Sequence, residues 1–252
     1  MSSYRFMVRF IAWIGRRVIP LAACGGLAVA GGGCHMASQG YNTEGVRFFQ
    51  QGQYSTAVTK FQQALANHPE DADAHYNLAA TYHQMGKTTA NTAWLQVSEE
   101  LYHQAIDRAP NHVEAHRGLA ALLVETDRSE SAFEMMQRWV KANPTSADAR
   151  LGLAQLYEEF GDLKTAQIQL NEAIALDPNH PRAWAAIGHL AERQGDAARA
   201  LASYQKSLAA NNLQPRLAER IASLQQHVVG GGYAAGVAGD TRYATQPTRP
   251  PR

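Results

Sequence analysis

The chain has 252 residues, of which 45% are hydrophobic and 18% charged. This composition is too apolar and too weakly charged for a disordered protein, and the length allows one or two domains. The net charge is +1, but residues 1–34 carry four arginines and no acid, so 19 basic residues face 22 acidic ones in the remainder. A slightly acidic body lacks the positive surface of a general DNA or RNA binder. Both cysteines, Cys24 and Cys34, precede that body, which excludes intramolecular disulfide scaffolds, zinc ribbons and iron–sulfur proteins.

Residues 1–37 have the pattern of an export signal. Arginines occur up to Arg17, and Val18–Gly33 is then uncharged and rich in Ala, Gly, Leu and Val. This run is short for a membrane span and fits the apolar core of a secretory signal. The sequence therefore predicts export.

The apolar run ends at a cysteine, which resembles the bacterial lipoprotein signal, where a Leu-Ala-Gly/Ala-Cys box precedes a lipidated cysteine. Leu21-Ala22-Ala23-Cys24 matches this box, but only six residues separate Cys24 from Arg17. Cys34 follows an apolar run of adequate length, although Gly31-Gly32-Gly33 departs from the box. We expect lipidation at Cys34, with Cys24 as the alternative. An ordinary cleaved signal and an uncleaved anchor are the other two possibilities.

From residue 38 onward the sequence repeats with a period of 34 residues. Prolines, turn residues and two series of small residues keep this step, except for one interval of 41. The four series are Pro69, Pro110, Pro144 and Pro178; Gly52, Gly86, Asp127, Gly161 and Gly195; Gly45, Ala79, Ala120, Ala154 and Gly188; and Ala57, Ser98, Ala132, Ala166 and Ala200. Their common phase predicts five repeats, at 38–71, 72–112, 113–146, 147–180 and 181–214.

Seven extra residues lie in the second repeat. The turn position and the second small position are five apart elsewhere, but twelve apart from Gly86 to Ser98. The insertion therefore falls within Lys87–Trp94, and we expect it to lengthen a turn, where added residues cost little.

Each period predicts two antiparallel helices. Apolar residues recur at helical spacing in both halves of the fourth repeat, around Leu151 in the first half and around Leu170 in the second. Gly161-Asp162 lies between the halves as a turn, and Pro178 follows the second helix, which it stops. The small residues let the two helices of a pair approach closely.

This pattern resembles the tetratricopeptide repeat (TPR) family over about residues 38–214. The fifth repeat matches best, and the third departs most, because Trp139 stands where other repeats carry Ala or Ser. The residues that carry the best match are Trp184, Ile187-Gly188, Gly195-Asp196, Ala200 and Tyr204. The resemblance implies an all-α fold, a right-handed α-solenoid of five helix pairs.

A single amphipathic helix is predicted at 215–228, with Leu217, Ile221 and Leu224 on its apolar side. Repeat stacks need such an element to cover their last apolar face, so we expect a capping helix. Residues 229–252 are rich in glycine and proline and predict a disordered tail.

The histidines are the main candidates for chemistry. His112 and His116, four residues apart, could place two imidazoles on one helix face. However, His112 belongs to an inter-repeat loop, and His75 and His116 share the repeat position of Trp184, which favours packing roles. The sequence contains no phosphate loop, nucleophile elbow or paired catalytic carboxylates. We expect no enzyme activity, cofactor, metal or nucleic acid.

The resemblance implies a concave surface lined by the first helix of each pair, where related repeats hold an extended peptide or a partner's helix. The outward stripe of these helices mixes apolar anchors with single polar groups. The predicted groove residues are Asn42, Phe49, Tyr76, His83, Arg117, Glu125, Leu151, Gln155, Glu158, His189 and Arg193. This set has too few cations to grip a C-terminal carboxylate as the chaperone-binding members of the family do.

These features together predict an exported scaffold, lipid-anchored in a bacterial cell envelope and facing the periplasm. It would bind a protein or peptide partner in pilus, secretion or cell-wall assemblies. The alternative is a soluble periplasmic regulator or accessory subunit of an enzyme complex, without a lipid.

Overall fold

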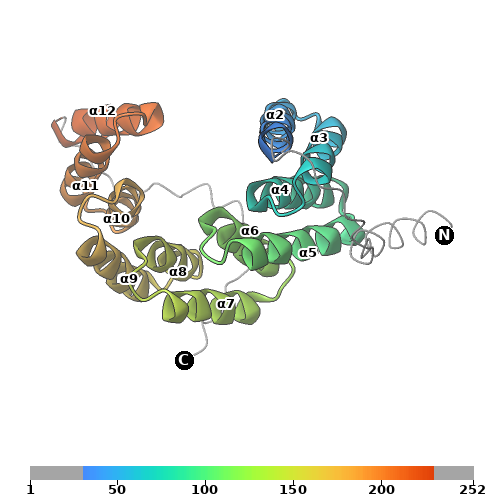
Figure 1. The fold of residues 1–252 in the computed structure, drawn as a ribbon. Coiled ribbons are helices and arrows are strands. Elements are labelled where there is room, and N and C mark those ends of the chain that lie inside the picture. Colours follow the sequence, from blue (N-terminus) through green and yellow to red (C-terminus); the bar gives the residue numbers. More distant parts are fainter. Residues whose placement is uncertain (1–30, 230–252) are drawn as a thin grey trace, which may run out of the picture.

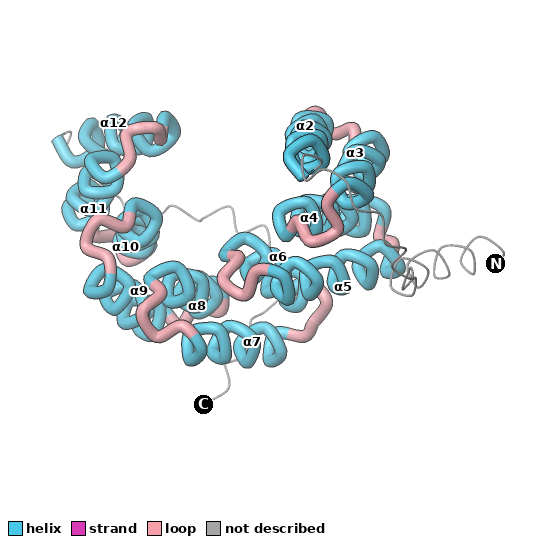
Figure 2. Tube along the Cα trace, in the orientation of Figure 1, coloured by secondary structure: helices cyan, strands magenta, loops and turns pink. Residues whose placement is uncertain are grey.

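The structure, a computed structural model, describes residues 31–229. Within this range the chain forms eleven α-helices and no strand (Figure 2). Cys24, most of the predicted export signal and the predicted tail beyond Val229 lie outside the described residues.

Ten of the described helices form five consecutive pairs, and one further helix follows them. The helices are α2 (Gly31–Gln50), α3 (Tyr54–Asn67), α4 (Ala72–Thr89), α5 (Thr92–Arg108), α6 (Val113–Glu125), α7 (Ser129–Ala142), α8 (Ala147–Glu159), α9 (Leu163–Leu176), α10 (Pro181–Arg193), α11 (Ala197–Ala210) and α12 (Pro215–Val229). The prediction of an all-α solenoid with a C-terminal helix is confirmed.

The pairs stack into an arc (Figure 1). Each first helix contacts the first helix of the next pair, whereas no two second helices approach each other as closely in the described part of the chain. The first helices α4, α6, α8 and α10 therefore lie on the inner side of the arc, and the second helices lie outside. The described ends of the arc are α2 with α3 and, opposite them, α12.

Turns within the pairs use left-handed backbone, which glycine adopts without steric cost. Gly161 and Gly195 both have φ of 78°. Asp127, which replaces glycine in the third pair, has φ of 58° and fills the same place. Asp is one of the few other residues that visit this region routinely.

The seven-residue insertion lengthens helices, and the expectation of a longer turn is wrong. The α4 and α5 helices have 18 and 17 residues, against 13 or 14 in each helix of the three later pairs. Gly86, predicted as a turn residue, lies inside α4, where Leu95 packs so closely that a Cβ would lie 2.6 Å from it. The added turns also stack Trp94 on Tyr82, with 5.0 Å between ring centroids, which a solvated loop would not do.

The buried residues form five core clusters in the described part of the chain, and the largest surrounds the third pair. Trp139 is 4% exposed and lies flat on His116, with 4.1 Å between ring centroids and 9° between planes. At the C-terminal end, Ile221 and Leu224 of α12 cover Tyr204 of α11. The helix α12 therefore closes the last apolar face.

Candidate partner-binding face

The predicted groove residues all lie on the first helices of the pairs, but they differ widely in accessibility. Three are exposed, five are partly buried and three are buried. The exposed residues are Arg117, His189 and Arg193. The partly buried residues are Asn42, Phe49, Tyr76, Glu125 and Gln155, and the buried residues are His83, Leu151 and Glu158.

Leu151 is not an exposed anchor, so that expectation is wrong. Its side chain is 1% exposed and packs in a core cluster with Ile187 and Leu190 of α10. The next pair covers this position on α8, and a ligand on the inner side does not reach it.

His83 and Glu125 join α4 to α6. The Nε2 atom of His83 lies 3.0 Å from Oε2 of Glu125, and Lys87 Nζ donates to Oε1 over 2.7 Å. Burial alone would raise the pKa of Glu125, but the bonds from His83 and Lys87 lower it. This carboxylate is therefore ionised and already neutralised by the chain itself.

Glu158 plays the same part between α8 and α10. His189 Nδ1 lies 2.8 Å from its Oε1, and Arg193 donates to its backbone carbonyl over 3.0 Å. The bond to the carboxylate raises the pKa of His189, and the pKa of Glu158 is lowered in spite of burial. Each of these two bridges joins neighbouring first helices through one acidic side chain.

Arg182 connects three pairs, a contact that the sequence analysis missed. From α10 it donates to Asp148 of α8 over 2.9 Å and to Glu114 of α6 over 2.8 Å. Only the curvature of the arc brings these helix N-termini together. The sequence does contain a pattern that could have predicted this contact, because four successive first helices carry a charged residue at the same repeat position. These residues are Asp73, Glu114, Asp148 and Arg182.

On the same inner side, Tyr76 of α4 and Arg117 of α6 lie near each other, close to the N-terminal ends of their helices. Arg117 is exposed and has no ion pair or hydrogen bond with another described residue. Tyr76 is half-buried, with its ring centroid 5.1 Å from that of His112. Burial raises the pKa of Tyr76, and the nearby charge of Arg117 acts against that rise. An aromatic ring beside an unpaired guanidinium is a typical hot spot of protein interfaces.

Comparison with known proteins identifies the repeat. A TPR repeat model matches residues 45–86, and tetratricopeptide repeat models match 95–147, 130–190 and 181–212. The chain belongs to the tetratricopeptide repeat family. TPR proteins are generally scaffolds without enzymatic activity that bind proteins or peptides, and the family resemblance seen in the sequence is confirmed.

Solved structures of TPR proteins share the fold. A thermophilic TPR protein of Thermus thermophilus is 26% identical, with a TM-score of 0.58 over 75% of this chain and 99% of that chain. A tetratricopeptide repeat protein from Parabacteroides merdae is 15% identical, with a TM-score of 0.57 over 73% of this chain and 70% of that chain. No curated protein matches the sequence.

Three histidines that the sequence analysis singled out have structural roles in this TPR chain. The prediction that His112 precedes a helix is confirmed, because it is the N-cap of α6 and its Nδ1 accepts from the Ala115 backbone N–H. His75 and His116 each place Nε2 2.9 Å from the carbonyl of the proline six residues earlier. Trp184 makes the same contact through its indole N–H, over 2.8 Å. The shared position therefore ties the second, third and fifth pairs to the preceding loop, whereas the fourth pair carries Arg150 there.

Residues 31–229 contain neither a metal-binding cluster of side chains nor a helix that could span a membrane. No three His, Cys, Asp or Glu side chains gather there in a way that could hold a metal ion. Within the same range, no helix combines the length and the hydropathy needed to cross a membrane.

Lowering the pH from about 7 to about 5 should destabilise the fold through His75 and His116. Burial lowers the pKa of both imidazoles, and the bonds to proline carbonyls offset it only in part. Below about pH 6.5 the unfolded chain therefore binds more protons than the folded chain. The stability that the two neutral imidazoles contribute is complete above about pH 6.5 and is lost as the pH falls. Urea titrations across this range would measure the slope.

The variant His75→Gln/His116→Gln is the control, because glutamine keeps an N–H donor and does not titrate. Its slope should be flatter than that of the wild type. His189, whose pKa is raised, opposes the trend but is present in both proteins. Equal slopes would show that the two buried rings do not carry the effect.

Proposed function

We propose that this TPR protein is an exported, lipid-anchored scaffold that holds a partner protein on the inner side of its arc. The observation that carries the proposal is the pair Tyr76 and Arg117, in which Arg117 is exposed without a hydrogen bond or ion pair to a described residue and Tyr76 lies half-buried beside it. A tyrosine and an unpaired arginine suit a protein surface that offers an acceptor or a carboxylate beside an apolar group. The proposal includes no catalysis, metal, cofactor or nucleic acid.

The anchor is proposed from the sequence alone, with Cys34 favoured over Cys24. Ser38, four residues after Cys34, is already buried and donates to the Ala64 carbonyl over 3.2 Å. At the helical rise, four residues span about 6 Å. A lipid on Cys34 would therefore hold the first pair directly at the bilayer, with its neighbours facing the periplasm.

In this role the scaffold would gather components of an envelope assembly such as pilus, secretion or cell-wall machinery. The second candidate is a soluble periplasmic regulator or accessory subunit of an enzyme complex, without the anchor. The two differ in one covalent modification, which can be measured.

Labelling bacterial cells with a clickable palmitate analogue should tag the wild type and Cys24→Ser, whereas Cys34→Ser should remain unlabelled. In-gel fluorescence of the immunoprecipitated protein gives the readout. Label on Cys34→Ser but not on Cys24→Ser would move the anchor to the alternative cysteine. Absence of label from the wild type would favour the soluble candidate.

Replacing both Tyr76 and Arg117 with alanine should weaken partner binding at least about tenfold, the equivalent of about 1.4 kcal/mol. Quantitative mass spectrometry of cross-linked, affinity-purified protein would measure recovery of the partner. Far-ultraviolet circular dichroism should be largely unchanged, because Arg117 is exposed and Tyr76, although it packs against the core cluster of the third pair, is only half-buried.

Arg138→Ala is the matched control, since this arginine is exposed on the outer helix α7. It should leave partner recovery intact. If the inner-side and outer-side variants recover the same partners at the same level, the inner side is not the binding face.

A further inference from the structure

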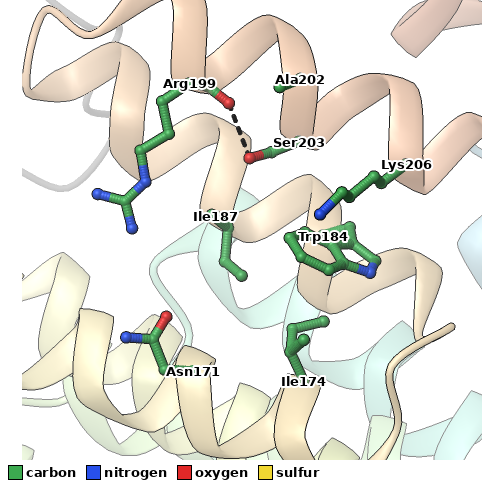
Figure 3. A pocket seen from close by; sticks show the side chains of 8 residues that line it. All are labelled: Asn171, Ile174, Trp184, Ile187, Arg199, Ala202, Ser203 and Lys206. Carbon is green, nitrogen blue, oxygen red and sulfur yellow. Dashed lines mark hydrogen bonds between the residues drawn. The ribbon is translucent and has the colours of Figure 1, made fainter.

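The outer side of the arc has a pocket between α9 and α11, away from the inner side described above. Its volume is about 310 Å³, enough for one or two side chains. Residues of α9 and α11 line its sides, and α10 lies between these two helices and contributes Trp184 and Ile187. Figure 3 shows Arg199 and Lys206 of α11 at the two ends of this pocket, with Ile187 between them.

The pocket is positively charged. No carboxylate lines it, and neither Arg199 nor Lys206 has an ion pair with a described residue. Lys206 Nζ lies 4.0 Å from the centroid of the Trp184 ring, while the indole N–H is used by the Pro178 carbonyl. Two cations therefore flank an apolar surface formed by Trp184, Ile187 and, from α9, Ile174 (Figure 3).

The equivalent groove one repeat earlier, between α7 and α9, provides an internal comparison. There Arg150 replaces Trp184, Glu172 replaces Lys206 and Thr165 replaces Arg199. Arg150 donates to Glu172 and also to Gln169, so the charges of that groove neutralise each other. The last groove differs at these same positions, and the differences leave its two cations without a counter-charge.

We propose that this outer pocket is a second binding site, which takes an acidic side chain flanked by an aliphatic or aromatic residue from a partner's extended segment. The carboxylate would lie between Arg199 and Lys206, and the apolar neighbour on Trp184 and Ile174. Charge complementarity favours a peptide segment over an anionic membrane, because lipid-binding surfaces use clusters of four to eight cations and this pocket has two. The site is independent of the inner side.

Selection of a phage-displayed library of random dodecapeptides on the full-length protein tests the proposal. Peptides that pair Asp or Glu with an aliphatic or aromatic residue should be enriched. Their affinity, measured by fluorescence anisotropy with synthetic copies, should fall at least tenfold for Arg199→Thr/Lys206→Glu. This variant carries the residues of the preceding groove, which the same fold already accommodates.

Two control variants and one vesicle assay accompany this experiment. Lys164→Glu, an exposed charge change on α9 outside the pocket, should retain affinity. Tyr76→Ala/Arg117→Ala should also retain these peptides, since it tests the inner side alone. Acidic peptides that bind the pocket variant as tightly as the wild type would overturn the proposal, as would a selection without acidic peptides. Sedimentation with phosphatidylserine vesicles that depends on Arg199 and Lys206 would assign the pocket to lipid instead.

Discussion

Replacing Trp139 with alanine should lower the free energy of unfolding by about 3–5 kcal/mol. The side chain is 4% exposed and fills the centre of the largest core cluster. Its ring lies flat on His116, and Cζ3 lies 3.4 Å from the place where a Cβ on Gly152 would be. Alanine at this position would leave a cavity that three helices border, and they cannot all close on it.

Urea denaturation followed by circular dichroism would measure the loss. Trp94→Ala is the matched control, because Trp94 is only half-buried and stacks on Tyr82 at the edge of its pair. We expect the control to lose clearly less. A loss for Trp139→Ala no greater than that of the control would contradict the central packing role of this ring.

Replacing Gly188 with alanine should destabilise the fifth pair, although alanine is the better helix former. An added Cβ would lie 2.5 Å from two carbons of the Tyr204 ring, which is 4% exposed and donates through its hydroxyl to Glu192 over 2.6 Å. Overpacking of this kind costs about 1–3 kcal/mol, against a gain of up to about 1 kcal/mol in helix propensity. We expect a net loss of about 1–2 kcal/mol.

Gly40→Ala is the opposite case, because nothing lies within 4 Å of its added Cβ. This variant should gain about 0.5–1 kcal/mol. Thermal or urea unfolding of both variants should therefore shift in opposite directions. Equal shifts would mean that the Tyr204 ring moves aside without cost.

A second change should rescue Gly188→Ala. The preceding pair has Ala154 and Leu170 at the positions of Gly188 and Tyr204, and both are buried in one cluster. Adding Tyr204→Leu should recover part of the loss in a double-mutant cycle, although the bond to Glu192 is gone. Strictly additive losses would show that the two positions do not pack as a unit.

The helix pairs and their turns could be predicted from the sequence because the same local pattern recurs in one phase. Asp127 illustrates this, since its place in the glycine series predicted a turn that its backbone then confirms. The form of the insertion could not be predicted, because a longer loop and two longer helices absorb the same number of residues. Burial of Trp94 against Tyr82 decides between them, and this contact is only visible in three dimensions.

The inner side was harder to predict than the fold. Leu151 and Arg117 stand at the same repeat position, yet one is buried and the other exposed. The difference depends on how the next pair packs, and periodicity within a single helix does not report this. The contacts of Arg182 depend in turn on the curvature of three stacked pairs.

The covered C-terminal face has a consequence for self-association. The outward side of α12 presents Arg216, Glu219 and Gln225 to solvent in place of an apolar stripe. Over residues 215–226, whose side chains the structure describes, a second copy's hairpin would meet these polar groups in place of an apolar stripe. Head-to-tail stacking of copies is therefore not favoured through this part of α12.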